Sequence, residues 1–99
     1  MKSSVYILQL NNGQFYIGSS GNVSRRLSEH QSGRTKSVVH KRPVKLVFEQ
    51  EFENEKLARQ VEYKLKRLKS RKIISDIIDS RRIDIVLLFG GKRINALGG

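Results

Sequence analysis

Five side chains in the first two thirds of the chain could together hydrolyse a phosphodiester bond. They are two phenols, a guanidinium, an imidazole and a carboxylate, from Tyr6, Tyr16, Arg26, His30 and Glu62. Such a reaction needs a base for the attacking water, cationic donors for the phosphate oxygens and usually a metal ion near the leaving oxygen. No Ser-His-Asp set, phosphate-cradling loop or Cys/His metal spacing competes in this sequence. The five residues therefore predict phosphodiester chemistry, provided that the fold brings them together.

Each of these residues also has a simpler structural interpretation. Tyrosines on strands usually pack in a core, and Arg26 could lay its aliphatic stem along a helix edge beside a buried His30. Glu62 could form an ion pair with Lys66, four residues later on the same helix. The chemical interpretation is favoured because all five side chains are expected on inward-facing positions.

A β-hairpin must position the two tyrosines. Residues 5–10 and 14–18 are predicted strands, and Asn11-Asn12-Gly13 has the composition of a turn. A two-residue loop would place Tyr6 and Tyr16 on opposite faces of the sheet, whereas a three-residue loop with Gly13 in the left-handed position places them on one face. The second register also leaves a more uniform apolar surface on the other face, formed by Val5, Ile7, Phe15 and Ile17, so we predict the three-residue loop.

A helix must position the arginine and the histidine. It is predicted from an N-cap at Asn22 to about residue 32, with Gly33 as its stop signal. Arg26 and His30 lie one turn apart on the side that carries the apolar stripe. Both side chains are therefore expected to face inward.

The glutamate belongs to a second helix that follows a third strand. The strand is predicted over residues 44–52, with Val44, Leu46 and Phe48 alternating on one face. The helix begins at residue 53 or 54, and Glu62 borders its apolar stripe, formed by Leu57, Val61, Leu65 and Leu68. A further helix over 71–80 is predicted behind a Ser70 cap.

The resulting fold class is α/β (α+β): a small three-stranded antiparallel sheet flanked by helices. The predicted domain spans residues 1–82. Residues 83–99 are predicted to be a tail, in which 85–89 forms an edge strand or a partner-binding segment and the glycine-rich end is partly disordered.

Charge and composition limit the classes of molecule and metal ion that the protein is expected to bind. Twenty Lys and Arg against nine Asp and Glu give a net charge of +11 and a pI near 10.5, which indicates a polyanion, above all nucleic acid. Cysteine is absent, so a metal would be bound by oxygen or imidazole ligands, which favours Mg²⁺ or Mn²⁺. The first residues do not resemble a signal peptide and the longest apolar run, 85–89, is too short for a bilayer, so we expect a cytoplasmic protein without a membrane partner.

The same residues resemble the GIY-YIG endonucleases. The resemblance runs through Val5-Tyr6-Ile7, Tyr16-Ile17-Gly18, residues 22–27 with His30, the start of the third strand at 42–47, and residues 58–66 with Glu62. Two positions depart from the family pattern. Val5 replaces the first glycine of the motif, and Ile74 lies near the place where some members carry an asparagine.

The resemblance implies a role for each residue. Glu62 would bind one Mg²⁺ or Mn²⁺ ion and Arg26 would neutralise charge on the scissile phosphate. Tyr6 or Tyr16 would accept the proton of the attacking water with help from His30, Arg26 or the metal, and the choice between the phenols stays open. Gly18 would let the phosphate approach the sheet backbone. Contacts to flanking phosphates are expected from Arg25, Arg34, Lys36, Lys41, Arg42, Lys66 and Lys69.

The expected function is that of a metal-dependent endonuclease acting on DNA. Because no sequence-reading domain accompanies the predicted one, the resemblance implies a structure-directed enzyme of repair or recombination, or one whose specificity comes from a protein partner. The alternatives are a noncatalytic nucleic-acid-binding module that keeps the fold, and an RNase. The oligomeric state is left open.

Overall fold

The computed structural model describes residues 2–34 and 39–90, and it contains the predicted hairpin. Strands β1 (Ser3–Gln9) and β2 (Phe15–Ser20) pair antiparallel, with Tyr6 opposite Gly18 and Leu8 opposite Tyr16. The backbone of Leu10 bonds to that of Gln14 at 2.8 Å, and Gly13 has φ 87°, a left-handed value that suits glycine. The three-residue loop is therefore confirmed, and both tyrosines share one face.

The third strand, β3 (Lys45–Phe52), pairs with β1 on the side away from β2, so that β2 is an edge strand. The predicted alternation along β3 is wrong. The register shifts between Ile7 and Leu8, where Ile7 faces Phe48 but Leu8 faces Leu46. This bulge carries one extra residue, Val47, and it moves Leu46 to the tyrosine face while Phe48 stays on the opposite face.

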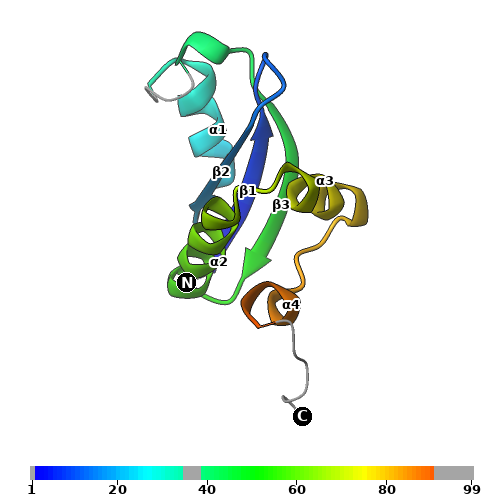
Figure 1. The fold of residues 1–99 in the computed structure, drawn as a ribbon. Coiled ribbons are helices and arrows are strands. Elements are labelled where there is room, and N and C mark those ends of the chain that lie inside the picture. The colour runs from blue at the N-terminus through cyan, green and yellow to red at the C-terminus, as the bar shows by residue number, and fades with distance from the viewer. Residues whose placement is uncertain (1, 35–38, 91–99) are drawn as a thin grey trace.

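Three helices lie on the two faces of the sheet. Helix α1 (Val23–Gln31) packs on the tyrosine face, and α2 (Glu55–Leu68) and α3 (Arg71–Ser80) pack on the other. Figure 1 shows α2 across the β1–β2 pair and α3 alongside β3. Each helix begins at a side-chain cap, from Asn22, Asn54 and Ser70, that accepts a hydrogen bond from the backbone three residues later. A short 3₁₀ helix, η1 (Val39–Lys41), precedes β3.

Two expectations about apolar residues in the C-terminal half are wrong. Residues 85–89 form a short helix, α4 (Ile85–Phe89), and not an edge strand, because Asp84 caps it by accepting hydrogen bonds from Val86 and Leu87. The alternative of a partner-binding segment stays a prediction. Leu68, expected in the buried stripe of α2, is 37% exposed because the helix ends there. The predicted disorder of the glycine-rich end concerns residues 91–99, outside the described residues. None of the helices described within 2–34 and 39–90 has the length and apolar character to span a bilayer.

Candidate active site

The two tyrosines meet at His30. Tyr6 and His30 are buried, and the Tyr6 hydroxyl lies 3.0 Å from His30 Nε2. The Tyr16 ring makes an edge-on contact with the imidazole, with ring centres 4.9 Å apart. The predicted hairpin register and the inward face of α1 thus bring three of the five residues into direct contact.

Arg26 joins the same cluster. Its guanidinium lies near the Tyr6 hydroxyl and favours the ionised form of that phenol, and it forms an ion pair with Glu29, which also accepts a 2.9 Å bond from Arg25. The Tyr6 hydroxyl can donate its proton to His30 Nε2 when that nitrogen is unprotonated. Sequence reasoning missed Glu29, although its spacing of three and four residues from the two arginines could have identified it.

Burial keeps both members of the Tyr6–His30 pair neutral near pH 7. It raises the pKa of Tyr6, a change that the nearby Arg26 guanidinium opposes and the nearby Tyr16 and Glu62 charges reinforce. Burial also lowers the pKa of His30 below its ordinary value of 6.5; Arg26 acts in the same direction and Glu29 in the opposite one. An unprotonated imidazole is the form that can accept the Tyr6 proton.

This pKa shift predicts a pH-dependent stability. The unfolded state binds a proton at His30 more readily than the folded state, so the free energy of unfolding should fall as the pH drops below about 6.5. His30→Asn should flatten this part of the curve, which denaturant unfolding between about pH 7.5 and about pH 5 would measure. The exposed second histidine provides the control, because His40→Asn should keep the wild-type slope. Equal slopes in wild type and His30→Asn would contradict the prediction.

Glu62 approaches the cluster from α2. One carboxylate oxygen accepts a 2.6 Å hydrogen bond from Ser19 Oγ, and the other pairs with Lys66 Nζ at 2.7 Å. Lys66 Nζ also lies 5.9 Å from the centre of the Tyr16 ring. The ion pair that offered a simpler interpretation of Glu62 is therefore present, but it also links the carboxylate to the tyrosines. Sequence reasoning missed Ser19, because its contact with Glu62 spans 43 positions and leaves no local pattern.

The Glu62 carboxylate fits a single hard cation. Its side chain is 20% exposed, Ser19 orients one of its oxygens, and the ammonium of Lys66 already lies against the other. No cluster of three or more His, Cys, Asp or Glu side chains occurs within the described ranges 2–34 and 39–90. Mg²⁺ commonly binds through one or two carboxylates, with water and substrate phosphates as further ligands, so one carboxylate suffices for this kind of site.

Gly18 lies directly beneath the Tyr6 ring. A Cβ atom at this position would stand 2.5 Å from both Cζ and the hydroxyl oxygen of Tyr6, which is closer than real contacts allow. The group that approaches the glycine closely in the structure is thus the phenol, whereas we expected a phosphate. A phosphate near this backbone stays a prediction.

This contact predicts that Gly18→Ala displaces Tyr6. The added methyl group has no space, because the phenol is buried between β2 and α1, so the substitution should destabilise the fold by about 1–3 kcal/mol. Gly21→Ala is a matched control, since its Cβ would meet only the Lys2 carbonyl oxygen, at 3.7 Å. Chemical denaturation would compare the two variants, and equal stabilities would contradict the assignment.

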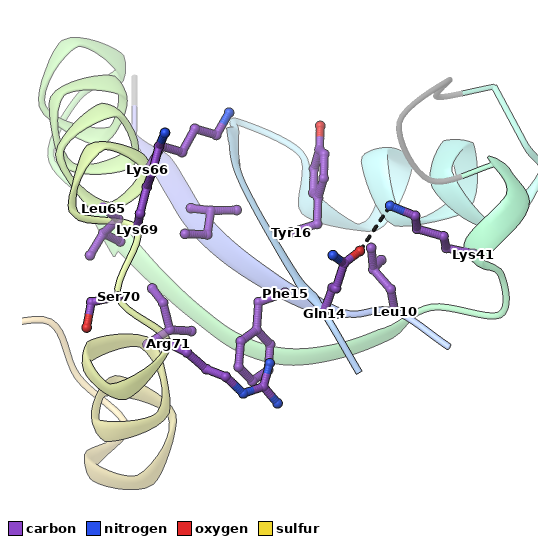
Figure 2. A pocket seen from close by; sticks show the side chains of 12 residues that line it. Leu10, Gln14, Phe15, Tyr16, Lys41, Leu65, Lys66, Lys69, Ser70 and Arg71 are labelled. Carbon is purple, nitrogen blue, oxygen red and sulfur yellow. Dashed lines mark hydrogen bonds between the residues drawn. The ribbon is translucent and has the colours of Figure 1, made fainter. Parts of the chain in front are cut away.

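A groove adjoins this cluster along the edge strand β2. It has a volume of about 580 Å³ and is lined by Tyr16 and Lys66 of the cluster, by Phe15, and by three more cations, Lys41, Lys69 and Arg71. Figure 2 shows Tyr16 and Phe15 pointing away from β2 in different directions, Tyr16 between Lys66 and Lys41, and Phe15 beside Arg71. Tyr6, Arg26, His30 and Glu62 lie outside its lining, so of the five predicted residues only Tyr16 faces the groove.

The residues expected to bind DNA phosphates divide into two groups. Lys41, Lys66 and Lys69 line the groove. Arg25 pairs with Glu29 on α1, Arg34 is exposed after α1, and Arg42 donates to the carbonyl oxygen of Gln31. Lys36 lies outside the described residues.

Comparisons with known proteins identify the family of this chain. The model of the GIY-YIG catalytic domain matches residues 2–74. A UPF0213 protein of Streptococcus pneumoniae is 38% identical over 69% of this chain and 70% of its own length, and one of Yersinia pestis is 32% identical over 80% and 84%. The solution NMR structure of a UPF0213 protein from Bacillus halodurans superimposes with a TM-score of 0.50, at 31% identity, over 97% of this chain and 94% of that one. Because the catalytic-domain model matches residues 2–74 and these relatives are more than 30% identical, the chain belongs to the GIY-YIG family, as a small member similar to the UPF0213 proteins.

Proposed function

We propose that this protein is a divalent-metal-dependent endonuclease that hydrolyses phosphodiester bonds in DNA. The observation that carries the proposal is the linked set of Arg26, Tyr6, His30 and Tyr16, joined through Lys66 to the Glu62 carboxylate. It combines candidate bases, a fixed cationic donor and a metal ligand beside a groove lined by cations. A module that only bound nucleic acid would not need a buried Tyr–His–Arg network next to a carboxylate.

The two phenols take different parts in the proposed mechanism. Tyr16 is half-buried and lines the groove, so its hydroxyl is the one that a water molecule beside a bound phosphate can reach. Tyr6 is 1% exposed, its hydroxyl lies 3.0 Å from His30 Nε2 and it lies near Arg26, so we assign it the role of holding these two side chains in position. We therefore assign general-base catalysis to Tyr16 and support of the cluster to Tyr6.

Arg26 and Glu62 act on the phosphate in this proposal. Arg26 remains charged and presents donors at a fixed place, where it stabilises the charge that develops on the phosphate oxygens. Glu62 would hold a Mg²⁺ or Mn²⁺ ion, displacing the Lys66 ammonium from its second oxygen. When bound, such an ion would supply Lewis-acid stabilisation of the negative charge that develops during cleavage.

Recognition of the substrate is proposed to depend on charge and shape. The net charge of +11 gives affinity for any nucleic-acid backbone but carries no base information. A branched, flapped or nicked DNA is therefore a better substrate than a defined sequence, which suits a role in repair or recombination.

A cleavage assay tests the proposal. The purified protein, with Mg²⁺ or Mn²⁺, should nick supercoiled plasmid or cut branched DNA, and a chelator should stop the reaction. Structured RNA as a parallel substrate distinguishes a DNA enzyme from an RNase. Failure to cut any of these nucleic acids with either metal would favour a noncatalytic binding module.

A further inference from the structure

The groove beside Tyr16 combines two kinds of surface that a duplex would not use together. Its cations, Lys41, Lys66, Lys69 and Arg71, come from η1, from α2 with the residue after it, and from the start of α3. Its floor is apolar, and the Phe15 ring there is only half-buried. Cations suit a phosphate backbone, whereas an accessible phenyl ring suits the flat face of a base.

Phe15 is already part of a stacked pair. The Arg71 guanidinium carbon lies 4.7 Å from the centre of the Phe15 ring, and Arg71 also donates to the carbonyl oxygen of Gly13 at 3.0 Å. The hairpin turn thus holds the guanidinium over the ring. Planar guanidinium groups and aromatic rings are the surfaces on which proteins stack unpaired bases.

The size of the groove also favours a single strand. Its volume of about 580 Å³ lies within the range of roughly 300–1,000 Å³ for pockets that hold small ligands, which is enough for one or two nucleotides. A duplex keeps its bases stacked inside and presents phosphates and sugars outward, so it would offer no base to the Phe15–Arg71 pair. An unpaired strand can place a base on the ring and its phosphates on the surrounding cations.

We propose that this groove binds an unpaired segment of DNA next to the scissile phosphate, with one base stacked on the Phe15–Arg71 pair. The position relative to the scissile phosphate rests on the proposed function, because Tyr16 and Lys66 belong to both the groove and the catalytic cluster. The substrate class that follows is DNA with a single-stranded region, such as a flap, an overhang or a gap.

Tryptophan fluorescence tests the stacking directly, since the chain contains no tryptophan. In Phe15→Trp, addition of single-stranded DNA in the presence of a chelator should quench the emission, and the same sequence as a blunt duplex should not. Tyr63→Trp is the matched control, because Tyr63 is 62% exposed on α2 and lies outside the groove, so its emission should change little with either DNA. Equal responses of Phe15→Trp to the two DNAs would overturn the proposal.

Affinity measurements provide a second test with variants that keep volume or charge. Phe15→Leu and Arg71→Lys should each weaken single-stranded binding about fivefold or more, with less than about a twofold change for duplex, because a stacked base contributes about 1–3 kcal/mol. Lys72→Ala, next to Arg71 but paired with Asp76 in solvent, should change both affinities equally. Thermal melting would verify that each variant folds. Parallel losses for both DNAs in Phe15→Leu and Arg71→Lys would mean that the groove binds phosphates alone, which overturns the proposal.

The groove-binding tests can be interpreted independently of the cleavage assay for the proposed function. Both binding tests are made without metal, so quenching and single-strand preference would support the groove even if the wild type cleaved nothing. If the wild type cleaves DNA with metal but Phe15→Leu still prefers single-stranded over duplex DNA as the wild type does, the proposed endonuclease function would be supported. The proposed base-stacking role of the groove would be overturned.

Discussion

Glu62→Gln is expected to reduce metal-dependent cleavage by about a hundred- to a thousandfold or more, while leaving the fold and DNA affinity nearly unchanged. The amide keeps the size of the side chain and can still accept from Ser19, but it loses the charge that attracts a hard cation. Losing ~3–4 kcal/mol of transition-state stabilisation corresponds to this rate loss. The lost ion pair with Lys66 is partly exposed and should cost only a few tenths of a kcal/mol of stability.

The control for this variant lies on the same helix. Glu55→Gln makes the same chemical change and breaks the same kind of pair, a 2.6 Å contact with Arg59 one turn later, but Glu55 is exposed and Ser19 bonds to Glu62 instead. It should cleave at the wild-type rate. Calorimetric titration with Mn²⁺ gives a readout besides activity, since Glu62→Gln should bind the ion more weakly than Glu55→Gln. Wild-type cleavage by Glu62→Gln would leave this residue with a structural role only.

Arg26→Ala is expected to lower the cleavage rate by about a hundred- to a thousandfold, because one fixed donor to a developing anion typically contributes that much. Single-turnover rates with saturating enzyme would separate this effect from weaker binding. Arg25→Ala is the matched control: it removes the adjacent arginine and the other cation paired with Glu29, but Arg25 is 60% exposed and makes no contact with Tyr6 among the described interactions. Similar losses in the two variants would show that Arg26 contributes general charge and no specific contact to the phosphate.

Short-range sequence patterns were enough to predict most of the helices and strands and to place the two tyrosines on the same face of the sheet. The loop at Gly13 requires a left-handed residue, and its length decides which face Tyr6 and Tyr16 occupy. The caps at Asn22 and Ser70 are equally local, since each side chain bonds to a backbone group three residues away. Helical periodicity then places Arg26 and His30 on the same inward side.

Long-range packing decided what sequence patterns could not. The bulge in β3 belongs to the pairing of this strand with β1. It places Leu46 and Phe48, on either side of Val47, on opposite faces of the sheet, and no local sequence pattern signals it. Residues 85–89 have strand-like composition, yet Asp84 caps them as a helix.

The detailed arrangement of the site also depended on tertiary contacts. Spacing predicted which residues could react, but only the structure showed that the Tyr6 phenol covers Gly18, that Ser19 orients Glu62, and that Tyr16 alone of the five faces the groove. The sequence by itself determined the family, the chemical groups and the faces they occupy, because these follow from residue types and short-range periodicity. The tertiary structure decided exposure and contacts across the sheet, because these depend on how helices α1 and α2 pack against opposite faces of the sheet.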